Sequence, residues 1–350
     1  MHKIFRAVKE RQKLLMKLVP LAAFAVPLLW LYFLKPATFE LMWKGRTFQL
    51  FFIWLVGLEL ILGWEDLQEF KIRKAFSARM IALLVSLALP TLYVVASYYW
   101  SLNEAIVKWA TQSHIQWASS MPLSTEYLVF TALFFAIVSL SFGFKGLKAF
   151  SVPAFFLAIV GLIYTIDNVF PYGQFTPFQI FVPTTTALAA AILNLMGYTT
   201  SIAYGQSSLE GNMPFLTSTD PHRLNASATF SIAWPCAGIE SFLIFTVVIL
   251  LFLKRMPISW KAKIGYFAFG VVVTYVINAL RVVSIFNIGM QYGATSSQVD
   301  LFHFYYGPLY AVAWIVSYPL IILVSQNLWR KIKKPKPTST EAQLPSPNPA

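Results

Sequence analysis

The sequence alternates between long apolar runs and short polar connections over most of its length. The runs recur at roughly 17 to 23 residues, which is the length that an α-helix needs to cross the hydrocarbon core of a bilayer. The pattern predicts spanning helices at 18–34, 48–64, 79–99, 127–144, 150–166, 237–253, 264–284 and 303–326. We therefore predict an all-α polytopic membrane protein with about eight transmembrane helices.

A further apolar stretch, 178–198, is predicted not to cross the membrane. Pro183 and the three threonines after it interrupt the run and leave about 13 helical residues up to Met196, which is too short to span. We interpret this stretch as an interfacial or re-entrant helix on the outer side. The polar segment 199–235 is then expected to be an external loop.

The basic residues predict the orientation of the chain. Lys and Arg number 27 against 14 Asp and Glu, a net charge of +13. If 178–198 does not cross, 21 of the 27 fall on one side, in 1–17, 65–79, 145–148, 254–263 and 330–336. By the positive-inside rule, that side is cytoplasmic and holds both termini. Because these charges are spread over several connections instead of one stripe, nucleic acid is not expected as a partner.

Composition excludes a soluble domain. The chain is 57% hydrophobic and 12% charged, whereas soluble domains carry about 25% charged residues; its mean hydropathy is +0.63. We expect a basic cytoplasmic N-terminus (1–17) without a cleavable signal peptide, and a transmembrane domain (18–326). A disordered basic cytoplasmic tail (327–350) is expected to follow.

The single cysteine, Cys236, excludes an intramolecular disulfide and a cysteine-cluster metal site. It lies at the predicted outer mouth of the 237–253 helix, after Pro235. A proline at the first helical position would put the thiol in the first turn, where free N–H groups and the helix dipole favour a thiolate. A lone cysteine in a membrane helix is more often a small apolar packing residue, so its position alone does not decide its role.

Arg281 lies near the outer end of the next predicted helix. Asn278 is three residues earlier and shares its face. An arginine at a helix end often only snorkels to the interface. The positive-inside rule, however, disfavours arginine on the outer side, and an ionisable group held there indicates a functional site.

His303 opens the last predicted helix at its outer end. Tyr306, Gly307 and Tyr310 follow it at helical spacing and predict one polar, partly open stripe. An interfacial histidine beside an aromatic belt is the alternative interpretation.

The predicted topology brings Cys236, Arg281 and His303 to the same membrane face from three helices. A thiol, an imidazole and a guanidinium are suited to acyl transfer through a thioester. Glu240, one turn below the cysteine, is favoured there by the helix dipole and is a candidate for contact with the site. Glu59, inside an apolar run, is predicted to pair within the bundle.

These residues resemble the exosortase/archaeosortase family of membrane transpeptidases. The resemblance lies in three ordered motifs over 178–326, which are Pro235-Cys236-Ala237-Gly238-Ile239-Glu240-Ser241, Asn278-Ala279-Leu280-Arg281, and His303 with Gly307. The sequence around the cysteine is similar to that of archaeal (thaumarchaeal-type) members. Ala237 and Glu240 depart from the usual Ser/Thr and Arg/Gln of the family.

The resemblance implies that Cys236 is the nucleophile, that Arg281 binds the carbonyl or oxyanion, and that His303 is the acid/base. Asn278, Gly238, Glu240, Tyr306 and Gly307 are expected to support the site or bind substrate. The implied partners are the C-terminal sorting signals of secreted proteins and a lipid or lipid-linked acceptor. No cofactor and no metal are expected, and the oligomeric state is left open.

Three other functions remain open at the level of sequence. A transporter or channel would carry ionisable residues near the bilayer midplane, whereas the candidates here lie at the outer face. A non-catalytic membrane scaffold would use Cys236 only for packing. A protease that releases its product to water would share the chemistry but not the acceptor.

Overall fold

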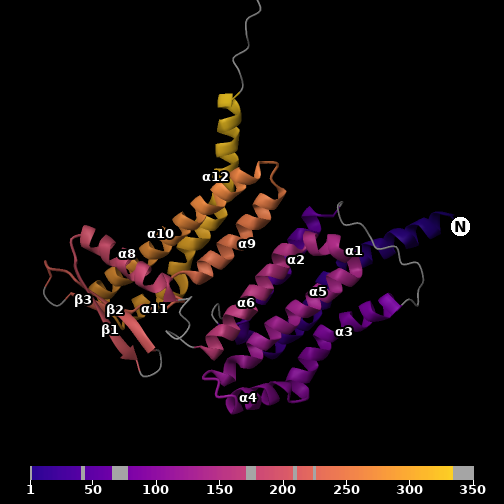
Figure 1. The fold of residues 1–350 in the computed structure, drawn as a ribbon, viewed down its shortest axis with the longest axis horizontal. Coiled ribbons are helices and arrows are strands. Elements are labelled where there is room, and N and C mark those ends of the chain that lie inside the picture. Colours follow the sequence, from indigo (N-terminus) through magenta and orange to yellow (C-terminus); the bar gives the residue numbers. More distant parts are fainter. Residues whose placement is uncertain are drawn as a thin grey trace, which may run out of the picture.

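The computed structural model describes residues 2–40, 44–64, 78–170, 179–207, 211–223 and 226–333. The chain is mostly helical, as predicted, and its helices form two groups that lie side by side (Figure 1). The first group comprises α1 (His2–Leu34), α2 (Thr47–Leu62), α3 (Ala78–Tyr99), α4 (Leu102–Gln112), α5 (Met121–Ala149) and α6 (Ser151–Val169). The second comprises α8 (Phe181–Leu195), α9 (Ile239–Arg255), α10 (Trp260–Tyr292), α11 (Ser297–Leu301) and α12 (Gly307–Lys333).

Aromatic side chains fill the core of the first group. Phe24 of α1 meets Phe52 of α2 and both Phe130 and Phe134 of α5, with ring centroids 5.4 to 5.7 Å apart and edge-to-face geometry. Such pairs add stabilisation beyond the burial of their area. Interlocked rings therefore hold these three helices at fixed distances.

The segment predicted as an external loop, 199–235, contains a three-stranded antiparallel sheet that the sequence analysis did not anticipate. Its strands are β1 (Thr199–Ser207), β2 (Gly211–Thr219) and β3 (Ser227–Ser231), in the order β1-β2-β3. Ala228 and Phe230 face α10, where a Cβ on Gly289 would lie within 3.0 Å of both. This glycine allows the sheet to approach α10 closely.

Six helices are long and apolar enough to cross a membrane, within the part of the chain that the structure describes. They correspond to six of the eight predicted spans. The other two predicted spans are α2 and α9, which have only 16 and 17 residues. The chain is thus a multi-pass membrane protein, while the number eight stays a prediction.

The short helix predicted within 178–198 is α8, with 15 residues. Pro183 lies in its first turn, where the missing N–H disturbs no helical hydrogen bond. The helix ends before Gly197, whose positive φ of 93° suits the left-handed residue that closes many helices. The predicted tail begins later than expected because α12 continues to Lys333; residues 334–350 lie outside the described part.

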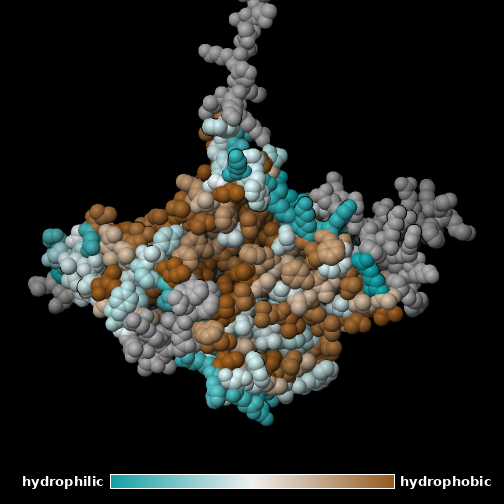
Figure 2. Space-filling model, viewed as in Figure 1, coloured by the Kyte–Doolittle hydropathy of each residue, from teal (hydrophilic) through white to brown (hydrophobic). Residues whose placement is uncertain are grey.

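The two ends of α9 are chemically different. At its C-terminal end, Lys254 and Arg255 both pair with Glu59 of α2, which is 1% exposed. This confirms that Glu59 pairs within the bundle, and it joins the two groups of helices. Cys236 precedes the opposite end of α9. Figure 2 shows apolar surface over the middle of the molecule and polar residues towards its ends.

Candidate active site

Cys236 lies in a turn before α9 and not in the first helical turn. The N–H of Ala237 donates to the carbonyls of Ala233 (3.2 Å) and Trp234 (3.1 Å). Gly238 then adopts φ +96° and forms the N-cap of α9, so the helix begins only at Ile239. The prediction that Pro235 opens the helix was therefore wrong, because the left-handed glycine separates the turn from the helix. The thiol still precedes a helix N-terminus.

Asn278 of α10 fastens this turn. Its side-chain amide donates to the carbonyl of Cys236 at 3.0 Å, and the residue is 3% exposed. A Cβ on Gly238 would lie 2.7 Å from Asn278 Cγ. Gly238 is therefore required twice, once for its positive φ and once for the space that Asn278 occupies.

Arg281 reaches across to the last membrane helix. Its Nη2 donates to the backbone carbonyl of His303 at 3.0 Å. A Cβ on Gly307 would lie 2.8 Å from Arg281 Nε, so only glycine leaves room for the guanidinium stem. The structure thus gives two of the predicted supporting residues, Asn278 and Gly307, direct contacts with the site.

His303 lies in a π-helical segment, Phe302–Tyr306, between α11 and α12. Such wide turns change the phase of the side chains and occur frequently at functional sites. The predicted stripe therefore does not form as expected. Tyr306 is 49% exposed and Tyr310 is 43% exposed, and neither borders the cavity that holds His303.

Cys236, Arg281 and His303 border one cavity of about 320 Å³. The cavity lies between β3, the C-terminal half of α10 and the α11 region. Its remaining lining residues are Phe230, Ser231, Ile232, Val282, Ile285, Phe286, Ala294, Val299, Asp300 and Phe304. The three groups that the sequence placed on one membrane face are thus brought into one pocket. Glu240 does not line it, although its carboxylate lies within electrostatic reach of Arg281.

Sequence reasoning missed the side of the cavity formed by β3. It also missed Asp300, which interacts electrostatically with His303 from one turn before it. The spacing of Asp300 and His303 is a signal in the sequence that went unused. Among the described residues, no group of three or more His, Cys, Asp or Glu is arranged to hold a metal ion.

A buried polar chain connects the Cys236 turn to the first group of helices. The indole N–H of Trp234 donates to Asp167 Oδ1 of α6 at 3.2 Å. Asp167 is fully buried and pairs with Lys44, whose Nζ lies 2.8 Å from Asp167 Oδ2. The same ammonium lies 3.2 Å from the ring centroid of Trp117. An acidic residue within an apolar run, such as Asp167, is a signal in the sequence that the region does more than pack apolar side chains.

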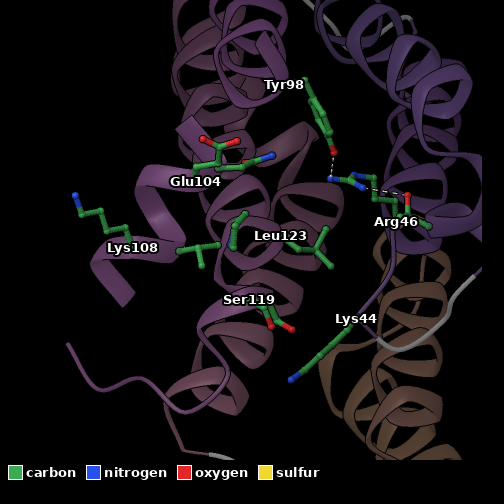
Figure 3. A pocket seen from close by; sticks show the side chains of 12 residues that line it. Lys44, Arg46, Tyr98, Glu104, Lys108, Ser119 and Leu123 are labelled. Carbon is green, nitrogen blue, oxygen red and sulfur yellow. Dashed lines mark hydrogen bonds between the residues drawn. The ribbon is translucent and has the colours of Figure 1, made fainter. Parts of the chain in front are cut away.

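Lys44 also lines a second, larger hollow of about 610 Å³ (Figure 3). Arg46 lies on its wall, donates to Tyr98 and holds Glu126 through two hydrogen bonds of 2.8 Å. Burial lowers the pKa of Lys44, an effect that Asp167 partly offsets. Burial opposes the charge of Arg46 too, but Glu126 raises its pKa overall.

The two buried cations in the hollow of Figure 3 are already paired. Lys44 pairs with Asp167 and Arg46 pairs with Glu126, while the side chain of Lys108 on α4 points away from both pairs. An anion would have to displace one of these partners, which costs several kcal/mol for a buried pair, of the order of 3. We therefore interpret the paired Lys44 and Arg46 as supporting structure and not as an anion site.

Residues 42–321 of the chain match the transmembrane exosortase family. The chain belongs to this family. The match begins well before the motifs that suggested it and includes α2 to α6 of the first group of helices, together with Cys236, Arg281 and His303. No curated protein and no solved structure matched the chain. Exosortases are membrane transpeptidases that act on sorting signals, and this is the class of activity that membership implies.

Proposed function

We propose that this exosortase is a cysteine transpeptidase that cleaves the C-terminal sorting signals of secreted proteins. The new carboxyl end is transferred to a lipid or lipid-linked acceptor at the outer membrane face, with both termini of the chain in the cytoplasm. The observation that carries the proposal is the cavity of about 320 Å³ that Cys236, Arg281 and His303 share. Family membership supports the same reaction class.

The first half-reaction forms a thioester. His303 takes the thiol proton of Cys236 while the sulfur attacks the scissile carbonyl carbon. Arg281 donates to the oxyanion; a guanidinium has five N–H donors, and one of them already holds the carbonyl of His303. The C–N bond then breaks, and His303 returns its proton to the leaving amine.

The second half-reaction resolves the thioester. An amine or hydroxyl of the acceptor attacks the thioester carbonyl and gives its proton to His303. The C–S bond breaks, and the sulfur recovers the proton as a thiol. Water in place of the acceptor would give simple hydrolysis, so the cavity must exclude water during this step. Its mainly apolar walls, with Val282, Phe286 and Val299 among them, favour that exclusion.

The test is the processing of a reporter protein that ends in a sorting motif, an apolar helix and a basic tail. Full-length enzyme should cleave it, and Cys236→Ala should abolish cleavage. His303→Ala should reduce the rate by at least about 100-fold, whereas replacement of the exposed His222 by alanine serves as the matched control. Mass spectrometry of the product's C-terminus distinguishes a lipid adduct from a free carboxylate. Full activity of Cys236→Ala contradicts the proposal.

A further inference from the structure

β3 is an edge strand that leads directly to the nucleophile turn. It pairs with β2 on one side, and no other described strand pairs with its second edge. After Ser231, only four residues separate the strand from Cys236. Unpaired N–H and C=O groups along a sheet edge form a template for another extended chain.

The hydrogen bonds of β3 reveal which of its backbone groups are left over. The N–H of Ile232 donates to the carbonyl of Pro214 at 3.0 Å, and the carbonyl of Ala226 accepts from Asp220 at 2.9 Å. Residues 226 and 232 therefore point their backbone groups towards β2. Because the direction alternates along a strand, the N–H and C=O of Thr229 and Ser231 point away from it.

The free edge of β3 borders the catalytic cavity. Phe230, Ser231 and Ile232 line that cavity, and no residue of β2 does. Val299 and His303 lie among the residues that close the opposite side. Phe230 also packs downward on α10 at Gly289, so the sheet is held in place from below while its edge stays open.

We propose that the substrate binds as an added strand along the free edge of β3, with an extended peptide segment pairing to Thr229 and Ser231. The inference rests on the proposed function and names how its substrate is recognised. Backbone groups that alternate in direction are matched by another extended polypeptide, and pairing of this kind is a recurrent mode of peptide binding. The outward backbone groups of Thr229 and Ser231 are about 7 Å apart, which is the spacing of alternate residues in an extended substrate. Together they would therefore pair with two substrate residues that are two positions apart.

This binding mode presents the scissile bond to the thiol. β3 runs towards the Cys236 turn, so a strand beside it is guided along the cavity to the same point. Main-chain pairing provides affinity without reading side chains, and the cavity walls then select the side chains of the motif. β1, the other edge strand, contributes no residue to this cavity.

The test removes one backbone donor and keeps the sheet. Ser231→Pro deletes the outward N–H, and a proline is tolerated on an edge strand whose N–H faces away from the ladder. Ser231→Ala is the matched control, because it deletes the exposed hydroxyl but keeps the N–H. With full-length enzyme and the sorting-signal reporter, we expect KM to rise about tenfold for Ser231→Pro. We expect kcat to stay within about twofold, and KM to rise less for Ser231→Ala than for Ser231→Pro because the alanine keeps the N–H.

A second measurement uses the unaltered enzyme and so does not depend on how the proline variant folds. Ester bonds replace the amides of the reporter's motif one at a time, which removes single substrate N–H groups. KM should rise at alternate positions only, and a uniform or absent effect contradicts strand pairing. A dimer that Ser231→Pro dissociates, together with an unchanged KM, assigns the edge to a second copy and overturns the proposal. If the unaltered enzyme does not cleave the reporter, the proposed function itself fails.

Discussion

The position of Arg281 depends on a neighbouring residue that has no side chain. Gly307 has no side chain where the guanidinium stem passes, and the carbonyl of His303 accepts one of its N–H groups. Gly238 similarly leaves space for Asn278, which holds the carbonyl of Cys236. Two glycines therefore set the positions of Arg281 and Asn278 at the candidate site.

Gly307→Ala is predicted to slow reporter cleavage by at least about tenfold, because the new methyl group lies on the path of Arg281 and small displacements of catalytic groups are costly. The matched control is Gly265→Ala in α10, where an added Cβ meets nothing within 4 Å. Cleavage rate and thermal unfolding are measured for both variants. Equal activity of the two variants contradicts the steric argument.

At the scale of elements, the Cys236 turn is anchored from both groups of helices. Asn278 of α10 holds its carbonyl, and Asp167 of α6 holds the indole of Trp234. Lys44 neutralises the buried carboxylate. The hydrogen bond between Trp234 and Asp167 thus connects the first group of helices to the Cys236 turn, so these helices are expected to help to position the thiol.

Trp234→Phe is predicted to lower kcat about tenfold with little change in KM, because the indole donor to a charged acceptor is lost. Asp167→Ala should lower kcat at least as much, and the double variant should be no worse than Asp167→Ala alone. If the two reductions in kcat multiply in the double variant, Trp234 and Asp167 do not act through their shared hydrogen bond. Glu59→Gln, which alters a buried carboxylate at the other end of α9, is the control for general destabilisation.

Sequence patterns predicted the helices and the membership of the site better than its geometry. Cys236, Arg281 and His303 were each identified from local signals, and the positive-inside count brought them to one face. The sheet was not predicted because its strands lie in a polar, threonine-rich segment without the strong alternation of a buried strand. The π-helical segment was not predicted because its side-chain phase depends on packing against Arg281 and not on the residues of the segment alone.

The whole molecule consists of two groups of helices joined at both ends. At one end Trp234 meets Asp167, and at the other Glu59 receives Lys254 and Arg255. Breaking a buried ion pair by removing one partner leaves charges without compensation. The junction opposite the active site is therefore expected to matter for stability and not for chemistry.

Glu59→Ala is predicted to destabilise the protein by about 3 kcal/mol, since both cations lose their buried partner. The midpoint of thermal unfolding in detergent, followed by tryptophan fluorescence, measures the loss. At a temperature where the variant remains folded, its kcat should equal that of the unaltered enzyme. A large fall in kcat there would show that this junction also shapes the active site.

The orientation of the whole chain is tested by its single thiol. Because Cys236 is the only cysteine, a membrane-impermeant maleimide applied to intact cells reports on one position. We predict labelling from outside, with the Cys236→Ala variant unlabelled. Labelling only after the cells are lysed contradicts the predicted topology. A small membrane-permeant maleimide controls for access to the cavity, because it should label the unaltered protein in intact cells and in lysed cells alike.

The hydrogen bond between Arg281 and the carbonyl of His303 makes the positions of both side chains depend on one stretch of backbone. A change of the π-helical segment into ordinary helix would displace both residues, because His303 is part of the segment and Arg281 is bonded to its backbone. The imidazole and the guanidinium of the proposed reaction are therefore expected to move together whenever this stretch of backbone moves.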